Sequence, residues 1–367
     1  MSIAQVCPRY HPYIGGIETH VQEISQRLSK KGLDIEVLTT DPSKKLSQEE
    51  EINGIKIRRF QSWTPNEAYY FSSSLKDFLQ QNSKKYKIVH AHSYHAFPAL
   101  YAMQSKTSNS LVFTPHYLGD GQTLFRNILH FPYKLMGSKI FERADSVICV
   151  SEYEKEQVTK RFGVKDTVKV IPNGVDFEEL SKFKWNPDTS NPKITFSGRL
   201  EKSQKNVDKL IRSFPLLLRE FSVDARFVIL GRGPFENEML RLVRKLGLGE
   251  RLTWKRWLPR EQYLEELASS SVFIAPSERE CFGIAAAEAI VLGVPTVVAD
   301  STALAEFVQK GLATGISLPL TPEKIARAIS EALDSPITQA SNNPKGKILS
   351  WDDVVTKLID TVYMNYL

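Results

Sequence analysis

The sequence predicts an α/β protein made of two doubly wound domains, each with a parallel sheet covered by helices. Short apolar runs of strand length alternate with longer segments whose apolar residues recur at helical spacing. The alternation stops at a polar, proline-bearing segment and then begins again. With 367 residues, the chain is long enough for two domains that each have a core.

The first domain is expected to open as strand, loop, helix and strand. Residues 3–7 are apolar, residues 8–16 are rich in structure breakers, and apolar residues then recur at helical spacing over 17–28. Gly32 ends that helix, and residues 35–40 resume as a strand. Further apolar runs of strand length lie at residues 87–92, 110–115 and 146–151.

The second domain repeats this scheme. Residues 193–198 predict a strand, and apolar residues at helical spacing over 207–214 predict the helix that follows it. A loop and a helix are expected over 231–247. Later strands are predicted at residues 226–231, 252–257, 271–276 and 295–300.

The link between the domains is predicted at residues 171–176, where the sequence IPNGVD breaks the pattern. The last segment has helical spacing and no strand after it, so we expect residues 351–367 to return to the first domain. The predicted domains are therefore 1–173, completed by that helix, and 174–350.

Charge is unevenly distributed along the chain. The net charge is +6, and residues 1–175 contain 23 Lys and Arg against 17 Asp and Glu, whereas the remainder contains 25 of each. This excess is compatible with contact between the first domain and an anionic membrane surface, or with solubility alone. Because no basic and aromatic motif accompanies the charge, nucleic acid is not expected as a partner.

The compartment expected from the sequence is the cytoplasm. No basic region followed by an apolar run opens the chain, and residues 284–299 are too short to span a bilayer. The cysteines are odd in number and far apart, which suits free thiols in a reducing compartment. Peripheral attachment at the inner face of the cell membrane remains open.

Loops between strands and helices are the first places to look for chemistry, because ligands of doubly wound sheets bind beyond the carboxyl ends of the strands. Gly15 and Gly16 could let a phosphate approach backbone N–H groups, although a tight turn would also explain them. Arg199 and Lys205 could hold a diphosphate, unless they belong to an exposed basic loop. A third loop, Gly231 to Pro234, could admit a nucleobase or ribose.

Two carboxylates stand out in the run SERECFGIAAAEAI, with seven residues between Glu280 and Glu288. One continuous helix would hold them about 12 Å apart. If the helix begins near Gly283, Glu280 lies in the preceding loop and Glu288 in the second turn, and both could face one ligand over the helix N-terminus. The alternative is a solvated Glu280 and a Glu288 at the rim of a buried helix.

The histidine run HAHSYH raises the question of a metal site. His90 and His92 could share one face of a strand, but no Asp, Glu or Cys lies nearby to complete a site with them or with His95. We therefore predict no metal, and expect that one of these histidines could line an acceptor pocket.

Several motifs together resemble glycosyltransferase family 4, the glycosyl transferases group 1. They are PYIGGIETH, VSEYEKEQV, IPNGVD, FSGRL with Lys205 and Asn206, VILGRGP and PSERECFGIAAAEAIVLGVPTVV. The likeness covers nearly the whole chain in the right order. It implies the GT-B fold, with two Rossmann-like domains and a cleft between them, and sugar transfer from a nucleotide donor with retention of configuration and without a metal.

The resemblance also implies roles for individual residues. Arg199 and Lys205 would hold the donor diphosphate, Glu280 would contact the donor sugar, Glu288 would bind the ribose hydroxyls, and His116 would face the transferred sugar. The catalytic set implied is thus Arg199, Lys205, Glu280 and His116. The donor-binding residues implied are Gly15, Gly16, Gly198, Gly231, Gly233, Phe282, Gly283, Ile284 and Glu288. Cys281 departs from the family, which often has Gly there, and should narrow the loop near the sugar.

The predicted function is therefore retaining sugar transfer from a nucleotide-sugar, UDP- or GDP-linked, with no cofactor. The expected partners are that donor and a glycan or lipid-linked acceptor of the cell envelope. A nucleotide-sugar epimerase of the same fold and a non-catalytic nucleotide-sugar binding protein are the alternatives.

Overall fold

A computed structural model of the chain describes residues 2–65, 68–119, 133, 136–334 and 344–367. It divides into two compact units. Unit 1 comprises Met1–Gly174 and Trp351–Leu367, and unit 2 comprises Val175–Ser350. Each unit is described by itself below.

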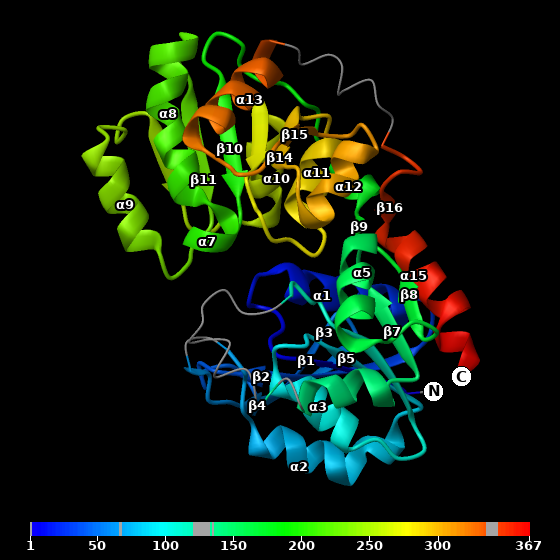
Figure 1. The fold of residues 1–367 in the computed structure, drawn as a ribbon. Helices are drawn as coiled ribbons and strands as arrows, with labels where there is room; N and C mark the ends of the chain where they lie inside the picture. Colours follow the sequence, from blue (N-terminus) through cyan, green and yellow to red (C-terminus); the bar gives the residue numbers. More distant parts are fainter. Residues whose placement is uncertain (1, 66–67, 120–132, 134–135, 335–343) are drawn as a thin grey trace. The chain divides into compact units, whose positions relative to one another are not determined.

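Unit 1 is a mostly parallel sheet with helices on both faces (Figure 1). The strand order is β3-β4-β2-β1-β5-β6-β7-β8, and β3 with β4 is its antiparallel pair. The strands are β1 Ser2–Cys7, β2 Asp34–Asp41, β3 Glu49–Ile52, β4 Ile55–Gln61, β5 Ile88–His92, β6 Ser110–Thr114, β7 Ser146–Cys149 and β8 Val168–Val170. The helices include α1 Gly16–Lys30, α2 Ser73–Asn82, α3 Phe97–Gln104, α5 Glu152–Phe162 and α15 Trp351–Thr361, with short turns η2 Ser83–Lys85 and η4 Tyr363–Asn365.

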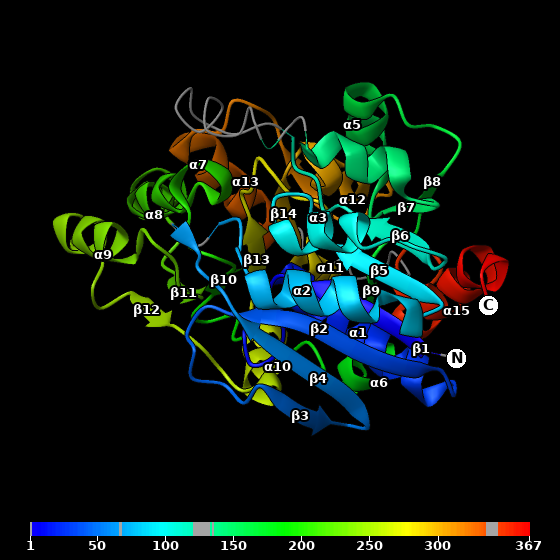
Figure 2. The same cartoon turned by 90° about the horizontal axis from the view of Figure 1, so that it is seen from below.

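Side chains on β5 show how the two faces differ. Val89 and Ala91 enter the core shared with α2 and α3, whereas His90 and His92 point to the opposite face, since neighbouring residues of a strand alternate. Figure 2 shows α2 and α3 side by side over the sheet. The prediction that His90 and His92 share a strand face is confirmed by this alternation.

The C-terminal helix α15 packs on α1 within unit 1. Arg27 of α1 donates from Nε to Asp352 Oδ2 at 3.3 Å. Beyond the helix, Gln5 Nε2 donates to the hydroxyl of Tyr363 at 3.1 Å, and that hydroxyl lies 2.7 Å from His90 Nδ1. The end of the chain is therefore part of the core of unit 1.

Unit 2 is a fully parallel sheet in the order β12-β11-β10-β13-β14-β15. The strands are β10 Lys193–Ser197, β11 Arg226–Leu230, β12 Leu252–Lys255, β13 Val272–Ala275, β14 Thr296–Ala299 and β15 Thr314–Ile316. The helices include α6 Phe177–Leu180, α7 Lys202–Lys205, α8 Val207–Phe221, α9 Glu236–Lys245, α10 Arg260–Ala268, α11 Ile284–Val291, α12 Ala305–Gln309 and α13 Pro322–Asp334, with η3 Thr302–Leu304. The short strands β9 Gly174–Val175 and β16 Leu349–Ser350 pair with each other.

The prediction of doubly wound α/β domains is confirmed, and the structure adds a hairpin that the periodicity did not indicate. Strands β3 and β4 are joined by Asn53–Gly54, and β4 continues the sheet in parallel with β2. Asn-Gly between two runs of strand residues is a strong hairpin signal, so the sequence did contain this information.

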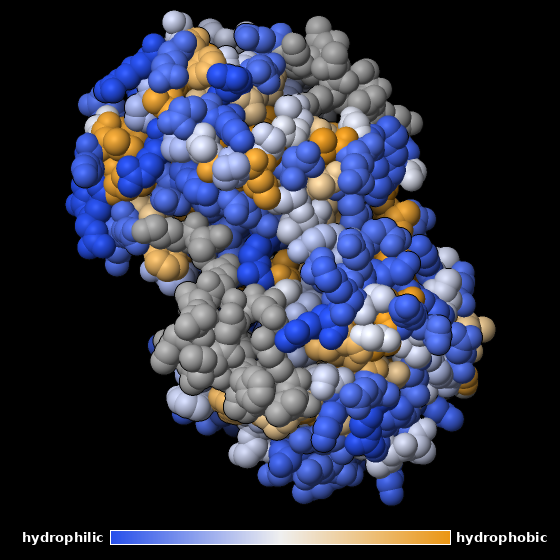
Figure 3. All heavy atoms as spheres, in the orientation of Figure 1, coloured by the Kyte–Doolittle hydropathy of each residue, from blue (hydrophilic) through white to orange (hydrophobic). Residues whose placement is uncertain are grey.

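One face of the molecule shows how polar and apolar residues are distributed on the surface (Figure 3). On the face shown in Figure 3, hydrophilic residues predominate and hydrophobic ones are scattered. No helix in the described ranges is both long and apolar enough to cross a membrane.

Candidate active site

The strand order of the unit 2 sheet indicates where a ligand would bind. The order changes direction between β10 and β13, which lie side by side, and ligands of such sheets bind beyond the carboxyl ends of the strands at this point. Residues 198–205 follow β10, and residues 276–283 follow β13. The two loops predicted to hold the donor therefore meet at one end of the sheet.

An ion pair joins these loops. Lys205 Nζ pairs with Glu280 Oε1, and the two side chains are 16% and 21% exposed. The loop of Glu280 is also held through its backbone, because Glu280 N–H donates to Thr302 Oγ1 at 3.2 Å. The structure thus brings together the cation and the carboxylate predicted to contact the diphosphate and the sugar.

Asn206 fixes the geometry of the loop that carries Lys205. Its backbone is left-handed, with φ of 49°, where α7 ends and α8 begins. Its buried side chain donates from Nδ2 to Pro276 O at 3.0 Å and to Glu278 Oε1 at 3.2 Å. The same carboxylate lies 3.2 Å from Lys209 Nζ. The β10 and β13 loops are therefore connected by direct hydrogen bonds.

Arg199 is more accessible than Lys205. Its side chain is 39% exposed, and Nε lies 3.0 Å from Glu201 Oε1. A guanidinium has five N–H donors in a planar fork, so it can bind more than one oxyanion at once.

The predicted start of the next helix is confirmed. Helix α11 begins at Ile284, after Gly283 with φ of 96°, so Glu280 lies in the loop and Glu288 in the second turn. The positive φ of Gly283 favours glycine, and a Cβ there would also lie 2.6 Å from Leu304 Cδ2, so that side chain would have to shift. The Phe282 ring packs edge-on against Phe307, with ring centroids 5.5 Å apart. Cys281 is half-buried in this loop and is not part of a disulfide.

Glu288 is held by two side chains of α10. Arg260 Nη1 donates to Glu288 Oε1 at 2.6 Å, and the hydroxyl of Tyr263 donates to Oε2 at 3.0 Å. The carboxylate is only 7% exposed. Each oxygen accepts one of these bonds and keeps a second lone pair for a hydroxyl group of a ligand.

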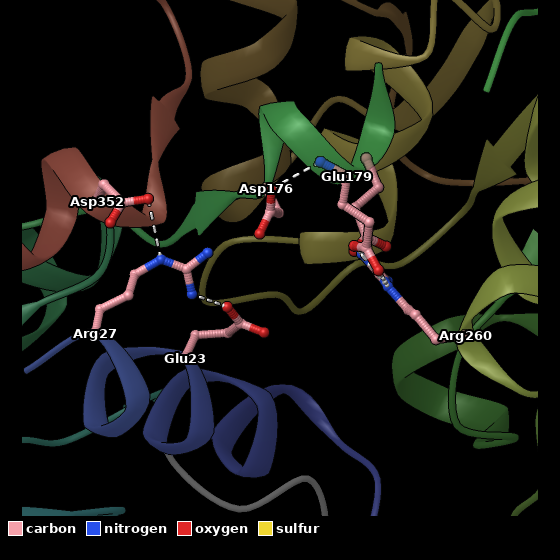
Figure 4. Close-up of polar contacts among 7 residues, drawn as sticks. Glu23, Arg27, Asp176, Glu179, Arg260 and Asp352 are labelled. Carbon is pink, nitrogen blue, oxygen red and sulfur yellow. Dashed lines mark hydrogen bonds and ion pairs between the residues drawn. The ribbon is translucent and has the colours of Figure 1, made fainter. Parts of the chain in front are cut away.

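Arg260 also binds Glu179 of α6, from Nη2 to Oε2 at 2.7 Å (Figure 4). Glu179 N–H donates to Asp176 Oδ1 at 2.9 Å, which caps α6 and fixes Glu179. Burial opposes the charge on Arg260, but the carboxylates of Glu288 and Glu179 outweigh this effect and raise its pKa above the ordinary value. Burial and Glu288 also raise the pKa of Tyr263, so its hydroxyl stays a donor.

Sequence reasoning missed Arg260, Tyr263 and Glu179. The available signal was weak: Arg260 and Tyr263 are three residues apart on a helix and so share a face, but nothing in the sequence relates them to Glu288. Glu179 lies outside α10 and is brought to Arg260 by tertiary folding.

The glycines of the β11 loop are explained by packing. Gly231 has φ of 139°, and a Cβ there would overlap the carbonyl oxygen of Gly198. A Cβ on Gly233 would overlap the carbonyl oxygen of Leu200. The backbone after β11 thus presses on the backbone that leads to Arg199, and binding of a nucleobase at these glycines stays a prediction.

Unit 1 contains the other predicted residues, beginning with Gly15 and Gly16 at the start of α1. The carboxylate of Glu18 lies beside Gly15 and pairs with Arg9 Nε at 2.7 Å. A Cβ on Gly16 would meet no atom within 4 Å, so there is open space above that residue. This space is compatible with the predicted approach of a phosphate.

His116 follows β6 with φ of 47°, and its Nε2 atom is buried. Its ring lies 5.0 Å from that of His20 and 6.0 Å from that of His92, measured between centroids. His90 instead has both ring nitrogens bonded, at 2.7 Å to Tyr363 Oη and 2.7 Å to Thr114 Oγ1. His95 is half-buried outside this group. The histidine cluster of unit 1 therefore comes from three different elements, and the HAHSYH run contributes only one member.

The two sheets and their loops define a GT-B architecture. Protein-family models then assign the family. The model of Glycosyltransferase Family 4 matches residues 14–179, and the model of Glycosyl transferases group 1 matches residues 177–347. The chain belongs to this glycosyltransferase family, as its motifs indicated.

Known relatives are similar over nearly the full chain. An uncharacterised glycosyltransferase of Methanocaldococcus jannaschii is 25% identical, over 98% of this chain and 97% of that protein. A phosphatidylinositol N-acetylglucosaminyltransferase of Arabidopsis thaliana is 26% identical, over 99% of this chain and 81% of that protein. Among solved structures, Anabaena HepE in complex with UDP and glucose has a TM-score of 0.79 at 18% identity, covering 99% of this chain and 100% of that one. At that identity the structural match supports the fold alone.

Proposed function

We propose that this glycosyltransferase moves a sugar from a UDP- or GDP-sugar to an acceptor with retention of configuration. One observation carries the proposal: Lys205 and Glu280 pair at the carboxyl ends of β10 and β13, where a ligand of such a sheet binds. A nucleotide-sugar needs cations for its phosphates and carboxylates for its hydroxyl groups, and this site offers both. The solved HepE structure contains UDP and glucose, which supports a nucleotide donor.

Electrostatic stabilisation by the cations would account for most of the rate enhancement. As the bond between the sugar and the diphosphate breaks, negative charge grows on the leaving diphosphate. Arg199 and Lys205, already positioned by Glu201 and Glu280, would stabilise that charge more than they stabilise the intact donor. Glu280 would bind a sugar hydroxyl while it orients Lys205.

Glu288 would bind the ribose. Its carboxylate is oriented by Arg260 and Tyr263 and retains acceptor capacity on both oxygens. Ribose hydroxyls can donate to these lone pairs, whereas a phosphate cannot. Backbone N–H groups of Phe282, Gly283 and Ile284 would help to bind the sugar end.

Retention would follow from a front-face path. The sequence offers no convincing nucleophile, and Glu280 is already committed to Lys205. The leaving diphosphate would accept the proton of the acceptor hydroxyl as the new bond forms on the same face of the sugar. Because side-chain cations neutralise the diphosphate, we propose that the transfer itself needs no metal.

Unit 1 would receive the acceptor. Gly15 and Gly16 would approach the diphosphate, for which the space above Gly16 is suitable. His116 would face the transferred sugar as a hydrogen-bonding group. The burial of His116 lowers its pKa well below the ordinary value, so it would act as neutral imidazole.

The acceptor is proposed to be a glycan or a lipid-linked molecule. The Arabidopsis relative is named for phosphatidylinositol, and the first half of this chain carries the excess of positive charge. Exposed cations near an anionic membrane contribute on the order of 1 kcal/mol each. Sedimentation with phosphatidylserine vesicles at low salt, but not with neutral vesicles, is expected; equal recovery in both supernatants would exclude membrane presentation of the acceptor.

The decisive assay follows the nucleotide and the anomeric configuration. Purified protein is incubated with UDP- or GDP-sugars and a panel of glycans and lipids that includes phosphatidylinositol. Nucleotide release only with an acceptor, and a product with the anomeric configuration of the donor by NMR, would support the proposal. Conversion of the donor sugar without any acceptor would indicate an epimerase, and binding without turnover would indicate a binding protein.

A further inference from the structure

Three buried histidines of unit 1 meet where its strand order changes direction. His20 lies on α1, which follows β1, His92 is the last residue of β5, and His116 follows β6. Strands β1 and β5 are neighbours in the sheet, and β1 is followed on its other side by β2. This is the switch point of the unit 1 sheet, where doubly wound folds bind ligands.

The three rings converge closely. One ring nitrogen of each histidine lies within 4.8 Å of the corresponding nitrogens of the other two. The ring of His20 has its centroid 5.4 Å from that of His92 and 5.0 Å from that of His116. All three side chains are buried.

Each ring also has a buried nitrogen without a partner among the described residues. These atoms are His20 Nε2, His92 Nδ1 and His116 Nε2. Buried polar atoms in native proteins nearly always have a hydrogen-bond partner, so three such atoms in one group require an explanation.

Neighbouring amides determine which nitrogens carry lone pairs. His20 Nδ1 lies 2.7 Å from Asn173 Oδ1, and His92 Nε2 lies 2.8 Å from Gln5 Oε1. An amide oxygen can only accept, so each of these ring nitrogens must donate its hydrogen. In a neutral imidazole the other nitrogen then bears a lone pair. His20 Nε2 and His92 Nδ1 are therefore free acceptors.

This arrangement is that of metal-binding histidines. A ligating imidazole almost always donates its second N–H to a carboxylate or carbonyl oxygen, which fixes the tautomer and the ring orientation. Three histidines with an open fourth position form a known type of zinc site. A site made only of imidazole ligands suits zinc and other late transition metals, such as copper and nickel. It does not suit magnesium or calcium, which prefer oxygen ligands.

We propose that unit 1 binds one transition-metal ion, with Zn²⁺ the best match, through His20 Nε2, His92 Nδ1 and His116 Nε2. Zinc holds nitrogen at about 2.0–2.1 Å, so tetrahedral ligands lie about 3.4 Å apart. Metal loading would therefore draw the three rings closer together than they lie in this structure. Asn173 and Gln5 orient the first two ligands without touching the metal.

This site is separate from the donor residues of unit 2, and the inference does not depend on the proposed function. Because the metal would bind His116 through Nε2, it would not occupy Nδ1 of that ring. The bound metal is expected to cross-link α1 with the carboxyl ends of β5 and β6.

The test uses the full chain, stripped with a chelator and titrated with Zn²⁺ alone. About one equivalent is expected to bind and to raise the melting temperature. Cobalt(II) in place of zinc should give the strong visible absorption of a tetrahedral nitrogen site, which reports geometry without relying on any activity or variant.

Variants identify the ligands. His20→Ala and His92→Ala are expected to abolish the cobalt absorption, and the exposed His11→Ala is the matched control that should retain it. Asn173→Ala keeps all three ligands but removes the group that orients His20, so it should weaken zinc binding by roughly 10–100-fold. If a ligand variant fails to fold, Asn173→Ala and the cobalt spectrum of the native chain still test whether the metal site exists.

Three results would overturn the proposal. These are no stoichiometric zinc on the native chain, a cobalt spectrum typical of six-coordinate oxygen ligation, or equal loss of binding in His11→Ala and His20→Ala. If zinc does not bind but the donor protects these histidines from chemical modification, a sugar hydroxyl rather than a metal occupies the group.

Discussion

Lys205 and Glu280 form an ion pair although they are 75 positions apart in the chain. The pair forms because β10 and β13 are parallel neighbours in the sheet, so the loops that follow them begin at the same edge. Neither residue is fully buried, so a ligand can reach both. The cation and the carboxylate therefore form one unit, in which each orients the other.

Lys205→Ala should lower kcat/KM for sugar transfer by roughly 100- to 1,000-fold, because removal of a group that stabilises transition-state charge has an effect of about this size. Lys209→Ala is the matched control, since Lys209 also pairs with a glutamate of the β13 loop, at 3.2 Å. The measurement is steady-state transfer with both variants. A similar loss in both, or less than about a threefold loss in Lys205→Ala, would exclude a direct role for Lys205.

Arg260→Gln should weaken nucleotide binding and destabilise unit 2. Glu288 is 7% exposed, and without Arg260 the side-chain partner of its carboxylate within the described ranges is the hydroxyl of Tyr263. Loss of a hydrogen bond to such a charged group costs about 1.5–3 kcal/mol. Isothermal titration with the nucleotide and urea unfolding measure the two effects.

The control for Arg260 is Arg251→Gln. Arg251 pairs with Asp224 at the surface, where the side chains are 42% and 70% exposed, and such a pair contributes at most about 1 kcal/mol. Equal unfolding midpoints for the two variants would show that Arg260 does not hold Glu288 in solution.

Gly231→Ala should displace the loop that carries Arg199. The new Cβ would overlap the carbonyl oxygen of Gly198, and φ of 139° is also unfavourable for alanine. We expect a loss of about 2–4 kcal/mol in the free energy of unfolding, together with weaker nucleotide binding. Gly249→Ala, whose Cβ would meet nothing within 4 Å, should leave both unchanged. Wild-type affinity in Gly231→Ala would show that the backbone contact does not position the site.

Asp41→Asn should destabilise unit 1 in a pH-dependent way. Asp41 accepts hydrogen bonds from Tyr13 Oη at 2.7 Å, from Ser43 N at 2.9 Å and from Leu46 N at 3.0 Å. Burial acts to raise the pKa of Asp41, but hydrogen bonds from Ser43, Tyr13 and Leu46 outweigh it and lower that pKa below the ordinary value.

The direction of this pH dependence follows from the number of protons that Asp41 binds in the folded and the unfolded states. Near the ordinary pKa, the folded protein holds fewer protons on Asp41 than the unfolded chain, so this stabilisation is complete above that pH and is lost as the pH falls through the folded value. Urea unfolding should show a deficit of about 2 kcal/mol for Asp41→Asn at neutral pH. This deficit should become smaller as the pH falls through the lowered pKa of Asp41. Asp77→Asn, at an exposed position on α2, is the control. A deficit that does not change with pH would contradict this assignment.

Much of the fold was predictable because apolar periodicity reflects burial. The runs at β1, β5, β6, β10, β11 and β13 are buried strands, and α11 begins where Gly283 indicated. The hairpin at β3 and β4 was missed because its strands are partly exposed and do not form a continuous apolar run, although Asn53–Gly54 marks its turn.

The site was predictable only in part. Family motifs identified Lys205 and Glu280, but the contact of Glu288 with Arg260 joins α11 and α10 through tertiary packing that no local pattern encodes. The same reason explains why the histidine cluster was missed. His20, His92 and His116 come from three elements, whereas the sequence drew attention to HAHSYH, where His90 turns out to be fully bonded inside the core.

The most direct test of the donor site is isothermal titration of UDP- and GDP-sugars into the native chain and into Glu288→Ala. We predict that one nucleotide class binds the native chain, and that Glu288→Ala, with its melting temperature checked, binds that nucleotide at least tenfold more weakly, a difference of about 1.4 kcal/mol. Equal affinity for the native chain and the variant would contradict the assignment of the ribose to Glu288 and of the donor to the loops after β10 and β13.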